Sequence, residues 1–264
     1  MDHRSICLCV SGLLLAAQFA CAEPTNIAED DAAHSGYSGS WGNDKNGGSG
    51  FAAWITTSEG TGADQHAGFF IAETSSNSDL NGIAKDGKAF GLFANGAGFE
   101  QAVAFRAFNK PLETGDSFSF MIETGGFEKK SDKETAGGGA IGLVLRSGSA
   151  SSSPADYNAG AMFEFGHYQG TTNYQIHDGT QNSDSGVAFT DSGVIVTMTV
   201  TGSDSYDLEI QTAKDKNLTK LPGRKFGSAG STKSGSIESM AVFNRNGEKN
   251  DAYFNGFQIS REAQ

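Results

Sequence analysis

The stretch EFGHYQGTTNYQIHDG, residues 164–179, gathers the side chains of this sequence that are best suited to acid–base chemistry. It holds one glutamate, two histidines, two tyrosines, two glutamines and an aspartate within two short runs. A carboxylate beside an imidazole raises the pKa of the histidine and fixes the orientation of its ring, and general acid–base catalysis can use such a pair. This stretch is therefore the first candidate for a functional site.

The turn signal QGTT at residues 169–172 predicts that the stretch folds as a β-hairpin. A turn centred on the two middle residues places Glu164 opposite His177. The next pair in this register is Phe165 with Ile176, and both side chains are apolar. We expect their face to pack in the core, because successive residues of a strand point to opposite faces of the sheet.

The other face of the hairpin is polar and carries the predicted site. Glu164, Gln175 and His177 are the catalytic candidates on this face. Tyr168 shares the face and is a candidate ligand-binding residue, and Arg106 is a catalytic candidate from another strand. The hydrated outer face of an ordinary antiparallel sheet has the same pattern, so both interpretations stay open.

Two further candidate ligand-binding residues lie on other predicted strands. Strand alternation places Trp54 on the face opposite Phe51 and Ile55, and an exposed aromatic ring can stack on a sugar. A tryptophan packed between two sheets is the alternative interpretation. Arg146 lies on the polar face of its own predicted strand.

The charge of the chain is negative overall but unevenly distributed. A formal net charge of −12 and a pI near 4.8 argue against nucleic acid and anionic membranes as general partners. Residues 214–233, in contrast, carry six Lys or Arg against a single Asp. Lys220, Arg224 and Lys225 are candidates for binding an anionic polymer there, and a solvated loop is the alternative.

The first 22 residues predict an export signal. A short charged start precedes an apolar run that is too short to span a bilayer, and small residues then favour cleavage after Ala22. Lipidation of Cys21 is the alternative. All three cysteines of the sequence, Cys7, Cys9 and Cys21, lie in this leader, so the mature chain has neither thiol nor disulfide. We expect a secreted, extracellular protein, with the periplasm or the cell surface as alternatives.

The rest of the chain has the pattern of short strands separated by tight turns. Glycine accounts for 36 of 264 residues, and apolar runs alternate with clusters of Gly, Ser, Asn and Asp. The predicted strands are residues 51–57, 66–73, 88–94, 99–108, 116–124, 139–148, 161–168, 173–178, 193–200, 205–212, 236–244 and 252–260. The sequence therefore predicts an all-β fold of about twelve strands, a two-sheet antiparallel jelly-roll sandwich, with a barrel as second choice.

No repeat or linker divides this chain. We expect residues 23–35 to form a polar, loosely ordered lead-in and residues 36–264 to form a single sandwich domain. The acidic turns at residues 182–186 and 202–205 can contribute ligands to a structural calcium ion, although turn-forming aspartates explain them as well. No other cofactor is expected.

The chain resembles the concanavalin A-like jelly-roll sandwiches of extracellular lectins and glucanases. Residues 46–54, NGGSGFAAW, look like their opening strand, and residues 251–260, DAYFNGFQIS, look like their closing strand. QIH at residues 175–177 is similar to the Q-[IV]-H strand of alginate-lyase-type jelly rolls. There the glutamine helps to neutralise the uronate carboxylate and the histidine acts as the base, which the resemblance assigns to Gln175 and His177.

This sequence departs from the alginate-lyase pattern in two other strands. The Tyr-Phe-Lys-x-Gly strand is half matched by residues 253–256, where Asn255 replaces the lysine. Arg106 stands alone where that family has Arg-x-Glu-x-Arg. The fold-level resemblance implies recognition of an extracellular carbohydrate or matrix polymer. The alternatives are a polysaccharide-cleaving enzyme, a lyase or glycosidase, that uses the 164–177 hairpin, and a structural surface protein without a specific ligand.

Overall fold

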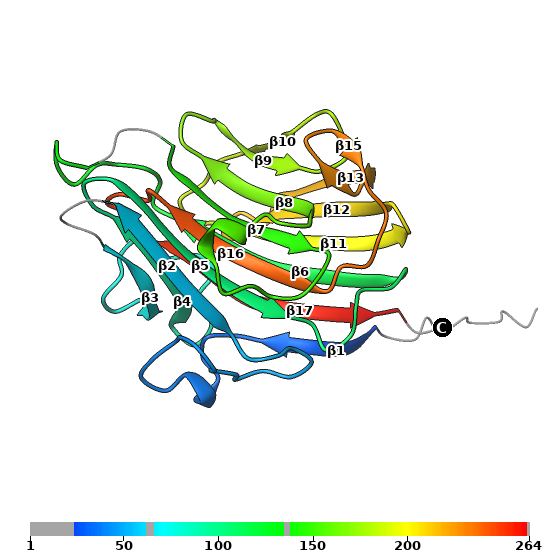
Figure 1. The fold of residues 1–264 in the computed structure, drawn as a ribbon, viewed down its shortest axis with the longest axis horizontal. Helices are drawn as coiled ribbons and strands as arrows, with labels where there is room; N and C mark the ends of the chain where they lie inside the picture. The colour runs from blue at the N-terminus through cyan, green and yellow to red at the C-terminus, as the bar shows by residue number, and fades with distance from the viewer. Residues whose placement is uncertain (1–23, 62–65, 135–137, 263–264) are drawn as a thin grey trace, which may run out of the picture.

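The computed structural model describes residues 24–61, 66–134 and 138–262. The predicted leader, residues 1–22, lies outside the described residues. The described chain folds into two large antiparallel β-sheets packed face to face, one small two-stranded sheet and two single-turn 3-10 helices, η1 (Ser35–Tyr37) and η2 (Pro154–Asp156) (Figure 1). The predicted all-β, two-sheet sandwich is confirmed.

The sheets take their strands from the whole described chain. The eight-stranded sheet comprises β1 (Thr25–Asp30), β3 (His66–Glu73), β4 (Lys88–Asn95), β6 (Asp116–Thr124), β11 (Val194–Gly202), β12 (Ser205–Thr212), β13 (Leu218–Lys225) and β17 (Ala252–Arg261). Its strand order is β13-β12-β11-β6-β17-β4-β3, and β1 also pairs with β17. The seven-stranded sheet comprises β2 (Ile55–Thr61), β5 (Phe99–Ala107), β7 (Ala140–Arg146), β8 (Ala161–Tyr168), β9 (Asn173–His177), β10 (Asp184–Ala188) and β16 (Ser239–Arg245), and β14 (Gly227–Ser228) pairs with β15 (Ser231–Thr232). Its strand order is β10-β9-β8-β7-β16-β5-β2.

The core lies between the two large sheets and follows from period-two alternation. Phe118, Phe120 and Ile122 of β6 are fully buried. Ser119 and Met121 alternate with them, point to the other face of the sheet and are partly exposed. The Phe120 ring meets the ring of Phe165 from the opposite sheet edge-on, at 6.1 Å between centroids. Edge-to-face aromatic contacts of this kind join the two inner faces.

The structure first corrects the expectation for the polar lead-in, residues 23–35. Residues 25–30, within the segment expected to be loosely ordered, form strand β1 and pair with Phe257–Arg261 of β17. The first half of β17 pairs with β4 on the same side, through Ala252–Phe254. Between the two halves, Gly256 has φ 58° and the buried Asn255 amide accepts from the Ala32 amide nitrogen. Figure 1 shows β1 (blue) beside the end of β17 (red).

The structure also corrects the solvated-loop interpretation of the basic stretch, residues 214–233. Residues 218–225 form an edge strand, β13, instead of a solvated loop, and β14 and β15 follow it as a small hairpin. The first predicted strand, 51–57, begins later than expected, at Ile55. Strand β10 was also missed, because its sequence DSGVA is short and polar.

Candidate functional site

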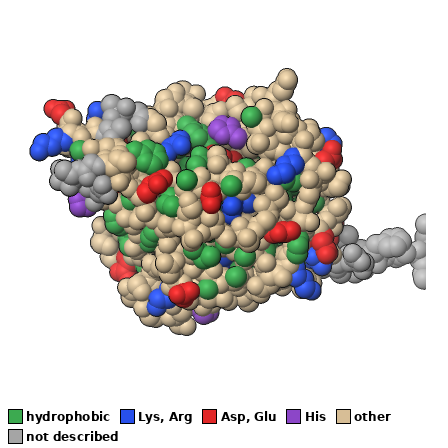
Figure 2. Space-filling model, viewed as in Figure 1, with side chains coloured by type: hydrophobic (Ala, Val, Ile, Leu, Met, Phe, Trp, Pro, Cys, Tyr) green, Lys and Arg blue, Asp and Glu red, His purple; other side chains and the backbone are tan. Residues whose placement is uncertain are grey.

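The hairpin of β8 and β9 has the register that the sequence predicts. Glu164 pairs with His177, Phe165 with Ile176, and Gly166 with Gln175. Phe165 and Ile176 are fully buried in the main core. The polar residues consequently lie on the outer face of the seven-stranded sheet, which faces the viewer in Figures 1 and 2.

Three side chains meet on this outer face. The Tyr168 hydroxyl donates a hydrogen bond to Glu164 Oε1 and lies 3.4 Å from His177 Nδ1. His177 Nδ1 is 3.8 Å from Glu164 Oε1. The bond from Tyr168 to Glu164 passes over Gly166, where an added Cβ would collide with the Ile141 carbonyl oxygen. Glycine at this position therefore lets β7 approach β8 closely.

Burial controls the protonation of this cluster. Glu164 is only 7% exposed, whereas the His177 side chain is 43% exposed. Burial raises the pKa of the Glu164 carboxyl, against the opposing effects of the Tyr168 hydrogen bond and the nearby His177. Burial also raises the pKa of Tyr168 well above its ordinary value, and the adjacent Glu164 adds to this effect. Tyr168 thus remains a neutral hydroxyl, and the imidazole is the member of the cluster that is open to solvent.

A small cavity continues the site along β9. It has a volume of about 210 Å³ and is lined by His177 together with the segment that follows β9 and the turn between β14 and β15. The other lining residues are Ile176, Asp178, Thr180, Gln181, Ser183, Ala229 and Gly230. The sequence carried no signal for this cavity, because residues 229–230 reach it only through the unpredicted β14–β15 hairpin.

Gln175 does not join the cluster in the way the alginate-lyase resemblance implies. Its amide Nε2 donates to the carbonyl oxygens of Asn173 and Tyr174, at 3.0 and 3.3 Å. The amide is therefore turned along its own strand, and its donor is already used.

The structure corrects the prediction that Arg106 and Trp54 contact a ligand, because both side chains are buried in the core between the sheets. Arg106 is fully buried, forms an ion pair with Asp30, and donates through Nε to the Ala52 carbonyl oxygen at 2.8 Å. Its guanidinium lies 4.9 Å from the Phe51 ring centroid and 4.8 Å from that of Trp54. Arg106 is therefore a structural cation that β1 neutralises, and it cannot reach a ligand on the outer face.

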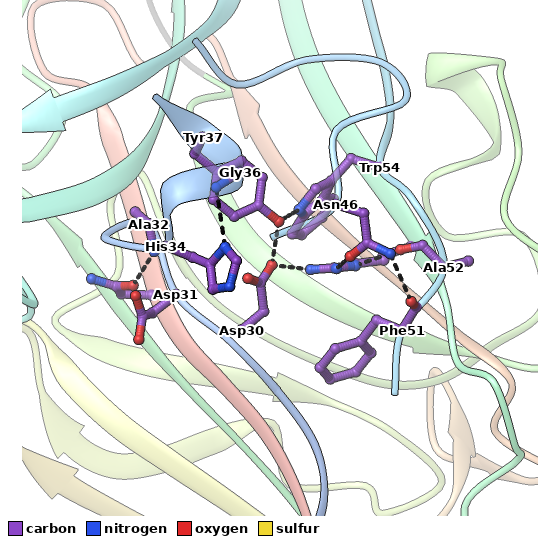
Figure 3. Close-up of polar contacts among 12 residues, drawn as sticks. Asp30, Asp31, Ala32, His34, Gly36, Tyr37, Asn46, Phe51, Ala52 and Trp54 are labelled. Carbon is purple, nitrogen blue, oxygen red and sulfur yellow. Dashed lines mark hydrogen bonds and ion pairs between the residues drawn. The ribbon is translucent and has the colours of Figure 1, made fainter. Parts of the chain in front are cut away.

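Trp54 is also fully buried, so it presents no ring to a sugar. Its Nε1 donates to the Tyr37 hydroxyl at 3.1 Å, and that hydroxyl donates to Asp30 Oδ2 at 2.5 Å. Burial raises the pKa of Tyr37 to about 12. Figure 3 shows Tyr37 and Trp54 converging on Asp30, so the core tryptophan interpretation is correct.

Arg146 lies on the outer face and makes its contacts within the chain. It is buried, with its guanidinium 5.0 Å from the Phe105 ring centroid. Its side chain donates to the carbonyl oxygens of Ala159 and Ser149, each at 3.0 Å. Arg146 thus anchors the connection between β7 and β8, residues 147–160, which we call the strap.

The three candidate cations of the basic stretch already have acidic partners. Lys220 pairs with Glu209 on the surface. Lys225 pairs with Asp204 at 3.2 Å, also on the surface.

Arg224 has a different role from the two lysines, because it is buried. Its guanidinium donates two hydrogen bonds to Asp178, from Nε to Oδ2 at 2.9 Å and from Nη2 to Oδ1 at 3.0 Å. Tyr206 donates to the same carboxylate. Arg224 is therefore a structural link between β13 and the end of β9, which corrects its assignment as a ligand-binding residue.

The aspartates of the acidic turns make contacts within the chain. Asp184 Oδ1 accepts from Asn173 Nδ2 at 2.8 Å and from the Gly186 amide at 2.7 Å. Asp204 is paired with Lys225. Within residues 24–61, 66–134 and 138–262, no group of three or more His, Cys, Asp or Glu is placed to hold a metal ion. None of the helices that the structure describes is long and apolar enough to cross a lipid bilayer.

Comparison with known proteins finds only solved structures of low sequence identity. No protein-family model matches the sequence, and no curated protein matches it. Similar solved structures include arcelin-5, a lectin-like defence protein from Phaseolus vulgaris (7% identity, TM-score 0.41, 80% of this chain and 100% of that chain). The legume lectin-like domain from Entamoeba histolytica (8%, 0.41, 74% and 90%) and the Ca²⁺-bound exoplasmic/lumenal domain of VIP36 (8%, 0.40, 80% and 84%) are two others. These TM-scores are near 0.4 and the identities are low, so the matches are similarities and carry no argument about family or ligand.

Proposed function

We propose that this chain is an exported protein that recognises an extracellular polysaccharide without cleaving it. The proposed binding surface is the outer face of the seven-stranded sheet over β8, β9 and β10. The observation that carries the proposal is the contact of Glu164, Tyr168 and His177 beside a cavity that His177 also lines. Export through the leader, residues 1–22, is part of the proposal.

The chemistry of these side chains suits sugar hydroxyls. A hydroxyl both donates and accepts, and a neutral imidazole offers one nitrogen of each kind. Tyr168 adds an aromatic ring whose face can pack against the C–H groups of a sugar. Figure 2 shows acidic and basic side chains interspersed over this face, without a large patch of one sign among the described residues. A surface of this kind favours recognition by directed hydrogen bonds over attraction to a strongly charged polymer.

Cleavage of a polysaccharide is the second candidate, because a proton donor and two acceptors touch one another in this cluster. Glycoside hydrolysis commonly uses two carboxyl groups about 5–9.5 Å apart. The residue paired with Glu164 across the two strands is His177 rather than a second carboxyl. An elimination, with His177 as base, is therefore the cleavage reaction that this arrangement would favour.

A single panel experiment separates these candidates. The mature protein is incubated with laminarin and xyloglucan, which are neutral, and with alginate and pectate, which are anionic. Retention is measured by affinity electrophoresis, hydrolysis by new reducing ends, and elimination by the absorbance of unsaturated uronate. We expect retention on at least one polymer with no product.

Variants then locate the surface. His177→Ala and Glu164→Gln should weaken retention while the melting temperature changes little. His66→Ala, an exposed histidine on β3 of the other sheet, serves as the matched control and should leave retention unchanged. If the wild type forms unsaturated uronate and the His177→Ala variant does not, elimination would replace recognition as the proposed function. The absence of both retention and product would favour a structural protein without a specific ligand and overturn the proposal.

A further inference from the structure

The strap covers the part of the outer face that is formed by β5, β7 and β16. β7 and β8 are antiparallel neighbours, so a tight turn could have joined them. Residues 147–160 instead fold back across the sheet, and the helical turn η2 within them contacts β5 and β2 (Figure 1). The outer-face side chains in the covered part form a buried apolar cluster: Val103, Phe105, Ala140, Val144, Ala241 and Phe243.

The strap is held at both its ends and its middle. Arg146 binds its two flanks through the Ser149 and Ala159 carbonyl oxygens. Gln101 of β5 donates to the Pro154 carbonyl oxygen at 2.8 Å. These bonds, together with the apolar cluster underneath, make the strap a fixed part of the sheet surface rather than an open loop.

The edge of the strap borders the Glu164 cluster. The Tyr157 ring packs on Phe243, with 4.7 Å between centroids. Tyr157 and Tyr168 pack against the same apolar cluster, and Arg245 of β16 pairs with Ala140 of β7, which in turn pairs with Tyr168 of β8. Tyr157 and Arg245 therefore form a wall on the β7 side of the cluster, which we call the strap wall. On the other side β9 and β10 are open to the edge of the sheet.

We infer that the strap wall closes one side of the site. The site therefore accepts the end of a polysaccharide chain instead of an internal segment of the chain. A glycan that lies across β10, β9 and β8 meets Tyr157 and Arg245 immediately beyond Glu164. An internal segment would have to continue over β7 and β16, where the strap fills the space. This inference rests on the proposed function and specifies its ligand as a chain terminus.

Shortening the polymer tests the inference. The retained polymer of the panel is cleaved by limited acid hydrolysis to about one tenth of its length, which gives about ten times as many ends per gram. If ends are bound, the mass concentration at half-saturation should fall about tenfold by mass action. An equal half-saturating mass for long and short chains would overturn the inference while retention itself leaves the proposed function intact. If no polymer of the panel is retained, the proposed function fails, and the inference fails with it.

A variant pair tests the strap wall directly. Tyr157→Ala removes the ring and should allow internal segments to enter, so the preference for short chains should fall from about tenfold toward equality. Tyr157→Phe keeps the ring and should keep the preference. Both variants are compared with the wild type by thermal unfolding, so that a misfolded variant is recognised. A tenfold preference that persists in a folded Tyr157→Ala variant would contradict the role of the strap wall.

Discussion

Glu164 and His177 lie directly opposite each other on β8 and β9, with 3.8 Å between Glu164 Oε1 and His177 Nδ1. The neighbouring residues Phe165 and Ile176 point to the inner face of the sheet and are fully buried. One hairpin therefore supplies both a piece of the core and the proposed site. Phe165 and Ile176 contribute more to stability than His177, because their apolar side chains are fully removed from water while the His177 side chain stays 43% exposed.

The first prediction compares neighbouring positions on β9. Ile176→Ala should lower the free energy of unfolding by about 2–5 kcal/mol, because it empties a fully buried aliphatic site. His177→Ala should cost less than about 1 kcal/mol, since it removes only a partly exposed cross-strand pair. Denaturant unfolding of the two variants measures both values. A larger loss for His177→Ala than for Ile176→Ala would mean that the two faces are reversed.

The second prediction concerns the buried ion pair of Arg106 and Asp30. Arg106→Met should lower the free energy of unfolding by about 3–5 kcal/mol, because it leaves the Asp30 carboxylate buried without its cation. The double variant Arg106→Met, Asp30→Asn should lose less than the sum of the two single variants. Retention per folded molecule should not change in any of them. A folded Arg106→Met variant with lost retention would restore the functional role that the sequence suggested for this residue.

The hairpin was predictable because the information that determines it is local. The turn signal and the apolar pair Phe165 and Ile176 are close in sequence, and their pattern excludes a one-residue shift of the register, which would exchange the two faces. The strap wall was not predictable. Tyr157 lies in a Ser-rich segment whose partners, Gln101 and Phe243, are distant in the sequence.

Arg106 shows why its face could not be assigned from the sequence. Its strand, FEQAVAFRA, is apolar on both sides, so alternation alone does not identify the inward side. Phe105 points outward and is buried only because the strap covers it. Arg106 points inward and is tolerated only because Asp30 neutralises it. Both explanations depend on segments that the sequence could not place.

The third prediction separates the cations of β13. Lys220→Gln together with Lys225→Gln should change the free energy of unfolding by less than about 1 kcal/mol, because both lysines form exposed pairs. Retention on pectate should also stay unchanged, since each lysine already has an acidic partner. Arg224→Gln should be clearly destabilising, because it uncovers the buried Asp178 carboxylate. Retention that falls in the double lysine variant and with rising salt would instead assign a docking role to this strand.

The fourth prediction concerns export. We expect the secreted protein to begin at Glu23, with an intact mass that lacks residues 1–22. Because Cys7, Cys9 and Cys21 all lie in that leader, the melting temperature should be the same with and without a thiol reductant. A lipid-modified Cys21 at the new N-terminus would replace secretion by anchoring at a cell surface.

The fifth prediction concerns His167, which lies between two phenylalanines at the end of the sandwich. Its ring stacks on Phe189 at 4.1 Å and on Phe127 at 5.3 Å, and Tyr174 meets it edge-on. Burial in this aromatic stack lowers the pKa of His167 to about 4.

The unfolded chain, with an ordinary histidine pKa of about 6.5, therefore binds more protons than the folded protein between pH 6.5 and 4. The contribution of His167 to stability is complete above pH 6.5 and decreases as the pH falls toward 4, by at most about 1.4 kcal/mol per pH unit. His167→Phe keeps the stack and removes the titration. The difference in unfolding free energy between wild type and variant should thus depend on pH in this range and be constant above it, because the buried carboxyls titrate equally in both proteins. A difference that is constant from pH 4 to 8 would show that the folded protein accommodates the charged imidazole.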